Sequence, residues 1–247
     1  QQYAQTSFGG RRLGEAADTL ELMIRDPDCF VVATLSGAMT VAKMGLVLVE
    51  MIERGWIQAI ISTGALMAHG FVEDSGRTHF KYDPRMDDVE LFNKGYDRVY
   101  DTLELEQNLD DIETIVRQVV DGIAEDTVLC SHLLMRELGS YLTKTCAKES
   151  RAILKSCYEQ QVPVYVPAFT DSELGLDVEV LNQMRLKEGK KRRSFDPFLD
   201  LENYARHMAV QKKTGIFTIG GGVPRNWAQQ LGPLLDLMTK RSGGDGD

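Results

Sequence analysis

The sequence predicts an α/β fold in which a doubly wound, mostly parallel sheet carries helices on both faces. Four short apolar runs, rich in β-branched and aromatic residues, are typical of buried parallel strands: Cys29 to Leu35, Ala59 to Ser62, Val162 to Val166 and Gly215 to Ile219. Helical patterns alternate with these runs, as they do in βαβ units. We therefore expect residues 1–247 to form a single domain.

The helical patterns cover Gly10 to Ile24, Val41 to Arg54, Leu109 to Ile123, Glu149 to Gln160, Leu199 to Lys212 and Arg225 to Lys240. A basic run from Lys187 to Arg193 lies between two of these segments. Charged runs of this kind are usually solvated connections, and a contact for a partner is the alternative.

Composition excludes several classes of protein. The formal net charge of −9 argues against a nucleic-acid surface and is compatible with cationic ligands. The four cysteines form no CxxC pair and no histidine stands at metal-ligand spacing, so we expect reduced, buried thiols and no metal: Cys29, Cys130, Cys146 and Cys157. No run approaches the roughly 20 apolar residues of a membrane span, which favours a cytoplasmic protein without a membrane partner.

Three predicted strands end in small or polar residues just before a helix: Ser36-Gly37-Ala38, Thr63-Gly64-Ala65 and Gly220-Gly221-Gly222. In open α/β sheets the ligand lies outside the carboxyl ends of the strands, so these turns should line one crevice. The triple glycine could let the backbone approach a phosphate or ribose, and a dinucleotide would fit there. It could equally be a tight connection, because its spacing is not that of GxGxxG.

Several side chains near these turns are candidates for binding. His69 follows the second turn and could donate to a ligand or shuttle a proton, although a lone histidine is more often structural. His79, His132 and His207 have weaker claims. The segment from Pro167 to Gly175 places Asp171 and Glu173 in a strand-end loop, where carboxylates suit an amine or a ribose hydroxyl. The alternative is a helix N-cap at Asp171 or Ser172.

The segment PAFTDSELG, the later segment KKTGIFTIGGGVPRNW and the upstream ISTGA together resemble deoxyhypusine synthase and its bacterial deoxyhypusine-synthase-like relatives. The resemblance extends from Thr6-Ser7-Phe8-Gly9 to the last predicted helix. It implies a Rossmann-like fold, a homotetramer and NAD held near dimer interfaces. In the family, NAD oxidises spermidine, a lysine captures the aminobutyl fragment as an imine, and the fragment passes to an acceptor amine and is reduced.

The resemblance also implies site residues. The NAD contacts would be Ser36, Thr63, Gly64, Ala65, Asp171, Gly220, Gly221 and Gly222, and the substrate contacts would be His69, Glu173, Asn226 and Gln230. Authentic synthases carry a histidine where this chain has Asn226 and a glutamate where it has His69. Asn226 cannot serve as an acid or base. These departures favour the deoxyhypusine-synthase-like branch, with a polyamine or guanidino-amine substrate and a small amine as acceptor.

The family's catalytic lysine lies in a Trp-Gly-Lys segment beyond Asp247, and we expect the native chain to continue at both ends. Lys212 and Lys213 precede the last strand, at its wrong end for the crevice, and Arg225 stays protonated and cannot form an imine. Other functions remain open: a true synthase acting on a protein lysine, a non-catalytic relative that binds NAD or polyamine, and a plain NAD-dependent oxidoreductase.

Overall fold

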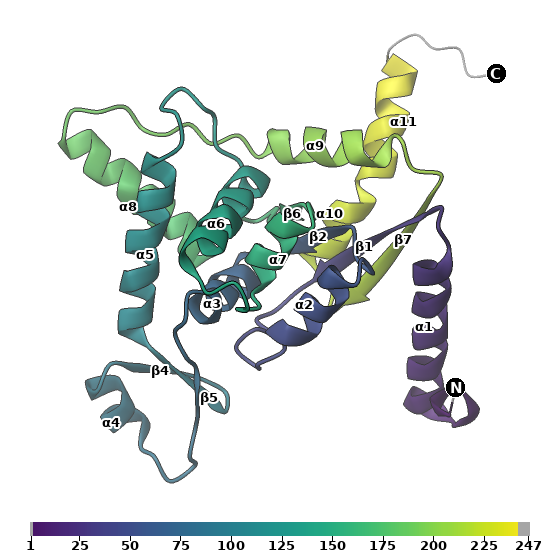
Figure 1. Ribbon diagram of the computed structural model, residues 1–247, viewed down its shortest axis with the longest axis horizontal. Coiled ribbons are helices and arrows are strands. Elements are labelled where there is room, and N and C mark those ends of the chain that lie inside the picture. Colours follow the sequence, from purple (N-terminus) through teal and green to yellow (C-terminus); the bar gives the residue numbers. More distant parts are fainter. Residues whose placement is uncertain (1, 242–247) are drawn as a thin grey trace.

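The computed structural model describes residues 2–241. Its centre is a four-stranded sheet in the order β6-β2-β1-β7, formed by Val164–Tyr165, Ala59–Ser62, Cys29–Leu35 and Lys213–Ile219 (Figure 1). All three strand pairs are parallel. The predicted α/β class is confirmed, and the carboxyl ends of the four strands lie at one edge of the sheet.

Helices cover both faces of this sheet. One face carries α2 (Gly45–Glu53), α3 (Gly64–Asp74), α5 (Glu106–Asp121), α6 (Ser131–Thr145), α7 (Ile153–Glu159) and α8 (Glu173–Lys187), and the other carries α9 (Phe198–Met208), α10 (Val223–Gln229) and α11 (Leu231–Arg241). Ala33 and Ile60 point into the first core, whereas their neighbours Val32 and Ile61 point into the second. Because successive strand residues face opposite sides, both strands must be apolar throughout.

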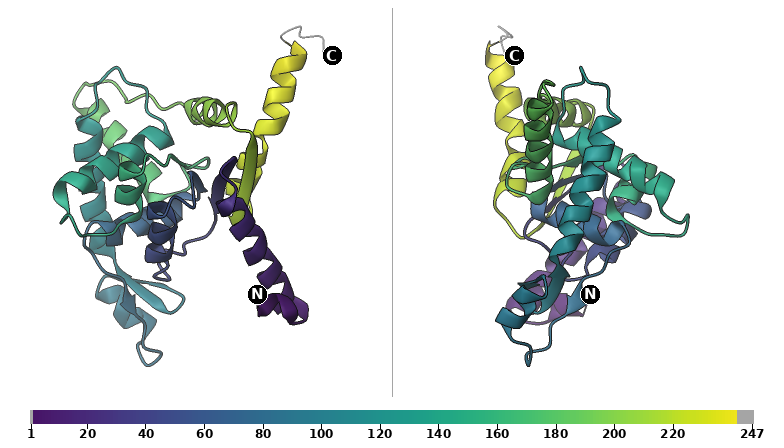
Figure 2. Two further views of the ribbon diagram at one scale, coloured as in Figure 1. Left: turned by 45° about the vertical axis from the view of Figure 1, so that its right-hand side comes forward. Right: turned by 90° about the vertical axis from the view of Figure 1, so that its left-hand side faces the viewer.

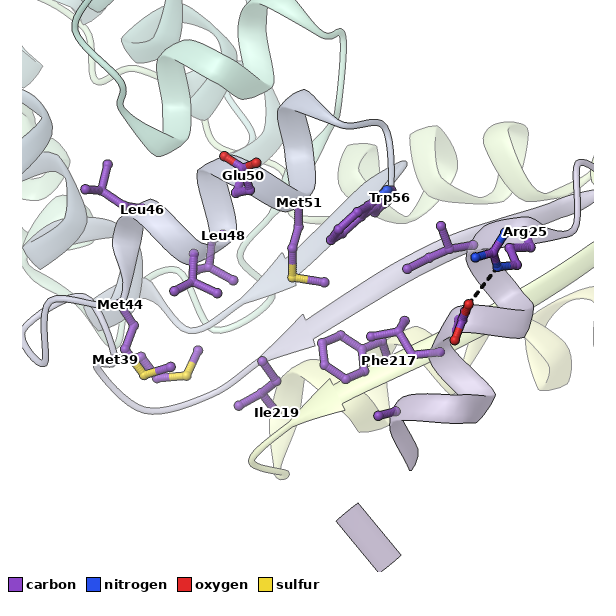
Figure 3. Close-up of a pocket in the computed structure, with 15 residues that line it drawn as sticks. Arg25, Met39, Met44, Leu46, Leu48, Glu50, Met51, Trp56, Phe217 and Ile219 are labelled. Carbon is purple, nitrogen blue, oxygen red and sulfur yellow. Dashed lines mark hydrogen bonds and ion pairs between the residues drawn. The ribbon is translucent and has the colours of Figure 1, made fainter. Parts of the chain in front are cut away.

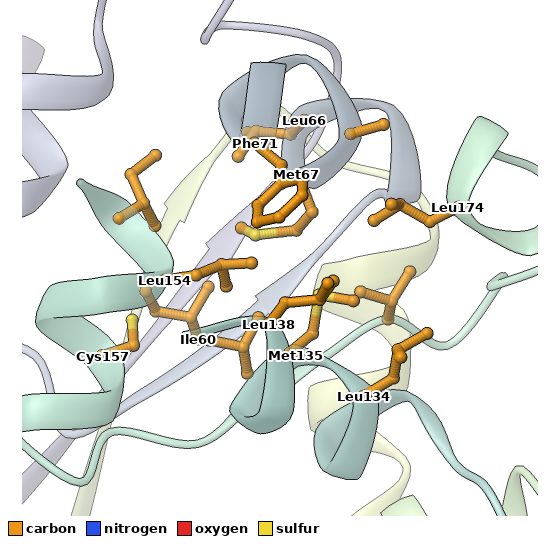
Figure 4. Close-up of a cluster of buried hydrophobic side chains, with 14 of the residues drawn as sticks. Ile60, Leu66, Met67, Phe71, Leu134, Met135, Leu138, Leu154, Cys157 and Leu174 are labelled. Carbon is orange, nitrogen blue, oxygen red and sulfur yellow. The ribbon is translucent and has the colours of Figure 1, made fainter. Parts of the chain in front are cut away.

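The larger core lies between the sheet and α3, α6 and α7. In Figure 4, Phe71 and Met67 of α3 lie close to Ile60 of β2, with Leu138 of α6 and Leu154 of α7 beside them. Ile60, Phe71 and Leu138 are all fully buried. This packing fixes α3, the helix that starts where β2 ends.

A long N-terminal helix stands beside β7, at the edge of the sheet (Figures 1 and 2). This helix, α1 (Phe8–Arg25), follows a short 3-10 turn, η1 (Tyr3–Gln5). Gly215 of β7 lies against Met23 of α1, and a Cβ at position 215 would come within 2.3 Å of the Met23 methyl carbon. The glycine therefore allows α1 to approach the strand.

A second, antiparallel sheet was not predicted. It has the order β3-β5-β4, formed by Phe80–Lys81, Thr102–Leu105 and Tyr96–Val99, and the short helix α4 (Asp88–Asn93) lies beside it. This unit extends away from the main body between α3 and α5 (Figure 1). Its outer strands are mostly exposed, so their residues carry little hydrophobic periodicity.

Other differences from the predicted elements have local causes. The predicted helix from Arg225 to Lys240 is two helices, α10 and α11, because Pro233 cannot donate a helical hydrogen bond and its ring would clash with the carbonyl of Gln229. The helix predicted from Glu149 begins only at Ile153, since Lys155 Nζ donates to the carbonyls of residues 147, 148 and 150 and holds that segment as a loop.

The basic run from Lys187 to Arg193 is a solvated connection except at its last residue. Arg193 is buried, and its guanidinium donates to the carbonyls of Val120, Ile123 and Ala124 at 2.9–3.0 Å. All four cysteines are free thiols, but only Cys130 and Cys157 are buried, so the expectation of burial was wrong for the other two. Within residues 2–241, no helix is long and apolar enough to cross a membrane.

Candidate functional site

The ends of four parallel strands enclose a cavity of about 350 Å³, as the strand-end turns predict. Its lining residues come from the loops after β1, β2, β6 and β7: Ser36, Ser62, Thr63, Gly64, Ala168, Asp171, Gly221, Gly222 and Val223. Six of the eight residues expected to contact NAD are among them. Ala65 and Gly220 are the two that are not.

Ser36 joins the loops after β1 and β7. Its Oγ accepts a hydrogen bond from the backbone N–H of Gly221 at 2.8 Å, and its own N–H donates to the carbonyl of Ile219 at 3.1 Å. Gly220 has φ +89°, and a Cβ there would come within 1.9 Å of Ser36 Oγ. Gly220 therefore shapes the cavity from outside it, because only glycine fits both the dihedral angle and the space.

The loops after β2 and β6 are held in a similar way. The Thr63 hydroxyl donates to the carbonyl of Gly37 at 2.7 Å, which ties the second loop to the first. Gly64 starts α3, and a Cβ at this position would come within 2.3 Å of both side-chain atoms of Ser172. The close approach of α3 to the loop after β6 thus depends on glycine at position 64.

The segment from Pro167 to Gly175 contains a helix N-cap, as one of its two interpretations predicts, and brings Asp171 to the cavity. Ser172 is the N-cap of α8: its Oγ accepts from the Gly175 N–H at 3.4 Å and donates to the Phe169 carbonyl at 2.8 Å. Asp171 is exposed and lines the cavity. The cap is therefore Ser172, which leaves the Asp171 carboxylate available to a ligand.

Glu173, two residues after Asp171, belongs to a group of three carboxylates. Glu173 and Asp177 lie one turn apart on α8, next to Glu113 of α5. Within the described residues, one oxygen of each is buried without a hydrogen-bond partner: Glu113 Oε1, Glu173 Oε2 and Asp177 Oδ2. Burial, together with the charges of Glu113 and Glu173, raises the pKa of Asp177 to about 7. A cation placed among these oxygens would relieve this repulsion.

His69 does not line the cavity. Its Nδ1 lies 2.7 Å from Glu104 Oε2, and His79 Nε2 lies 3.3 Å from Glu104 Oε1. The other ring nitrogen of His79 lies 3.0 Å from Glu73 Oε1. Sequence spacing did not reveal this group, because its members come from α3, from the segment before β3 and from β5.

A second cluster joins Cys130, His132 and Asp200. The Asp200 carboxylate accepts from the Ser131 hydroxyl at 2.7 Å, the His132 N–H at 2.9 Å and His132 Nδ1 at 2.9 Å, and it thereby caps the start of α6. Burial raises the pKa of the Cys130 thiol to about 11, so the thiol stays protonated. This arrangement is a satisfied hydrogen-bond network that joins α9 to α6.

The remaining predicted substrate residues lie outside the cavity. Asn226 is exposed on α10, and Gln230 is exposed directly after it. Among residues 2–241 no lysine lines the cavity, and Lys212 and Lys213 pair with Asp28 and Asp26 at the amino end of β7. Their exclusion as catalytic lysines agrees with this placement. His132 and His207 line a separate cavity of about 500 Å³.

A larger cavity, of about 990 Å³, lies between α1, α2 and β7. In Figure 3, Leu48 and Met51 of α2 face Phe217 and Ile219 of β7 across it. Glu21 and Arg25 of α1 also line the cavity and form an ion pair at 2.8 Å. The floor of this cavity is formed by aliphatic, aromatic and methionine side chains. The charged residues that line this cavity are already paired, Glu21 with Arg25 and Glu50 with Arg54 and Arg151. The strand-end cavity, with its exposed carboxylate and open glycine turn, is therefore the better candidate site despite its smaller volume.

Comparison with known proteins identifies relatives of the chain. The family model for deoxyhypusine synthase matches residues 1–244. A protein named probable deoxyhypusine synthase 2 in Methanosarcina acetivorans is 30% identical over 97% of this chain and 68% of its own length. A deoxyhypusine synthase-like protein of Chlorobaculum parvum is 32% identical over 96% of this chain and 67% of its own. The chain therefore spans about two-thirds of the length of these relatives.

The fold has a counterpart of known structure. A crystal structure from Entamoeba histolytica, assigned as a deoxyhypusine synthase, superposes with a TM-score of 0.67 over 90% of this chain and 73% of its own, at 13% identity. That likeness concerns the fold, whereas the family rests on the sequence matches. Together with the motifs at the strand ends, these matches show that the chain belongs to the deoxyhypusine synthase family of aminobutyl transferases.

Proposed function

We propose that this protein is an NAD-dependent transferase that moves a 4-aminobutyl group from a polyamine to a small acceptor amine. One observation carries the proposal: a single loop presents Asp171 to the strand-end cavity and, two residues later, Glu173 to a group of unpaired carboxylates. On this proposal, the ribose and the ammonium group would bind at residues that lie two positions apart in the sequence.

The cavity suits the cofactor. Gly221 and Gly222 line it, and a Cβ at either position would meet no atom within 4 Å, so the missing side chains leave open space beside the backbone. The Asp171 carboxylate can accept hydrogen bonds from ribose hydroxyls. NAD bound here would supply the hydride acceptor that makes a carbon next to nitrogen electrophilic. Ser36 and Thr63 would hold the loops around it.

The amine would bind among Glu173, Asp177 and Glu113. Three buried carboxylate oxygens without partners attract an ammonium group, which supplies both charge and hydrogen-bond donors. A polyamine has two such groups separated by a flexible chain. One could bind to the carboxylates while the carbon to be oxidised reaches the cavity.

The acceptor is proposed from the two departures from authentic synthases. Asn226 replaces a histidine and His69 replaces a glutamate, which favours a small amine over a protein lysine as acceptor. The imine-forming lysine and the homotetramer are expected from the family resemblance. Light scattering of the full-length protein would test the assembly.

The test is a transfer assay with the full-length protein, NAD, spermidine labelled in its butyl portion, and putrescine. We expect the label in a homospermidine-like product with release of 1,3-diaminopropane and no net NADH. Glu173→Gln should raise the KM for spermidine, and Asp171→Asn should raise the KM for NAD. Label on a lysine of an added acceptor protein would identify a true synthase, net NADH would identify an oxidoreductase, and NAD binding without transfer would identify a non-catalytic relative.

A further inference from the structure

His69, His79 and Glu104 bring three potential metal ligands together outside the cavity. Their ligand atoms, two imidazole nitrogens and a carboxylate oxygen, all lie within 4.8 Å of one another. The site is buried: His79 and Glu104 are each 2% exposed, and the side chain of His69 is 13% exposed. We propose that these three residues bind a divalent first-row transition metal ion, with Zn²⁺ as the probe.

The Glu104 carboxylate lies at ion-pair distance from both imidazoles, but these contacts are not aligned as hydrogen bonds. Within the described residues, His69 Nδ1, His79 Nε2 and Glu104 Oε1 are buried without a hydrogen-bond partner, although the nitrogens lie 2.7 and 3.3 Å from the carboxylate. Unpartnered buried polar atoms are costly. In a tetrahedral zinc site with bonds near 2.0–2.1 Å, neighbouring ligand atoms are about 3.3 Å apart. The 3.3 Å between His79 Nε2 and Glu104 Oε1 matches this separation, whereas His69 Nδ1 lies 2.7 Å from the other oxygen, Oε2, so His69 or the carboxylate would have to shift for the three residues to share one ion.

The surroundings of His79 are those expected around a metal-binding histidine. Its Nδ1 contacts Glu73 Oε1 at 3.0 Å, which leaves Nε2 to face Glu104. Histidines that ligate a metal usually donate their other ring N–H to a carboxylate in this way. Glu73 is itself paired with Lys43. The outer layer of groups that orients a metal ligand is therefore present.

The Cys130, His132 and Asp200 cluster makes the contrast clear. It also brings three potential metal ligands together, but its Asp200 oxygens and His132 Nδ1 are already hydrogen-bonded. Metal binding there would have to break this network, whereas at His69, His79 and Glu104 it would replace two ion-pair contacts that are not aligned as hydrogen bonds. Two imidazoles also favour zinc-like ions over Mg²⁺ or Ca²⁺, which prefer oxygen ligands.

The position suggests what the ion would do. His69 lies on α3, whereas Glu104 lies on β5 and His79 precedes β3. The metal would join the antiparallel sheet, which extends from the body in Figure 1, to the helix that starts at the cavity. Bonds to three separate segments would stabilise this junction, because the metal binds only the folded arrangement.

The test is metal uptake by the full-length protein, stripped with a chelator, dialysed and titrated with Zn²⁺ in a calorimeter. We expect about one equivalent per chain and a rise in Tm on binding. His69→Gln and Glu104→Gln should each weaken binding by more than about 100-fold, and Glu73→Gln by about 10–100-fold. His132→Gln is the matched control and should bind Zn²⁺ as the wild type does.

Cobalt substitution decides the outcome even if a variant fails to fold. Co²⁺ in the unaltered protein should show visible absorption typical of nitrogen and oxygen ligands, without a thiolate charge-transfer band. Failure to take up either ion would overturn the proposal. So would a thiolate band, or loss of binding in His132→Gln alone, since both would place the metal at Cys130. None of these readouts depends on transferase activity.

Discussion

Asp177 should make the stability of the protein fall as the pH rises through neutrality. Its folded-state pKa of about 7 exceeds its ordinary value of 3.8, so the folded protein holds this proton more tightly than the unfolded chain does. The resulting stabilisation is complete below about pH 4 and is lost as the pH rises to 7. Asp177→Asn mimics the protonated side chain and should remove this dependence.

The size of the effect follows from the shift. Three pKa units correspond to roughly 4 kcal/mol. Asp177 is only partly buried, and solvent screening reduces the effect to about 2 kcal/mol. Most of this loss falls between pH 5 and pH 8. Over that interval the free energy of unfolding of Asp177→Asn should therefore rise by about 1 kcal/mol relative to the wild type.

Urea unfolding of both proteins at pH 5 and pH 8, followed by tryptophan fluorescence, measures this difference. Asp110→Asn is the matched control, because it removes an exposed carboxylate from the same helix as Glu113. Spermidine at pH 8 should stabilise the wild type more than Asp177→Asn, since the ammonium group replaces the missing proton. Parallel pH profiles for wild type and Asp177→Asn would refute the reasoning.

Two further substitutions test the framework of the site. Gly220→Ala should lower the Tm by several degrees and weaken NAD binding at least about tenfold, because its Cβ would strike Ser36 Oγ at a positive φ. A Cβ at position 221 meets nothing within 4 Å, so Gly221→Ala should leave the Tm near that of the wild type. Equal Tm values for Gly220→Ala and Gly221→Ala would contradict this description of the turn. Arg193→Met should destabilise the protein by about 3 kcal/mol in urea unfolding, since it leaves buried carbonyls without donors, whereas the exposed neighbour Arg192→Met should change stability by less than about 1 kcal/mol.

Sequence reasoning succeeded where hydrophobic burial and chain geometry coincide. The strand from Cys29 to Leu35 is apolar on both sides because it faces two cores, and its bounds were predicted without error. Because parallel strands place their carboxyl ends at one edge of a sheet, the location of the strand-end turns could also be predicted. The antiparallel sheet was missed because Phe80–Lys81 is only two residues long and exposed, which gives no periodic signal.

The candidate site divides in a way that the sequence could not reveal. Its cavity is shaped by backbone and hydroxyl groups, whereas the coupled ionisable groups do not line it. In the sequence His69 is a candidate donor to a ligand, because it follows the turn at Thr63 by less than two helical turns. The structure turns it instead toward Glu104, which is 35 positions later and on a strand that the sequence did not indicate.

The cavity and the histidine cluster should therefore respond independently to perturbation. If the cavity is built by Ser36, Thr63 and the glycines, its affinity for NAD depends on loop geometry and little on the histidine cluster. Chelation of the proposed metal should then lower the Tm and expose the antiparallel sheet to proteolysis while it changes the Kd for NAD by less than about threefold, as expected for distant sites. A large loss of NAD affinity on chelation would instead mean that α3 transmits the state of His69 to Gly64 at its first turn, and the cavity and the histidine cluster would then act as one site.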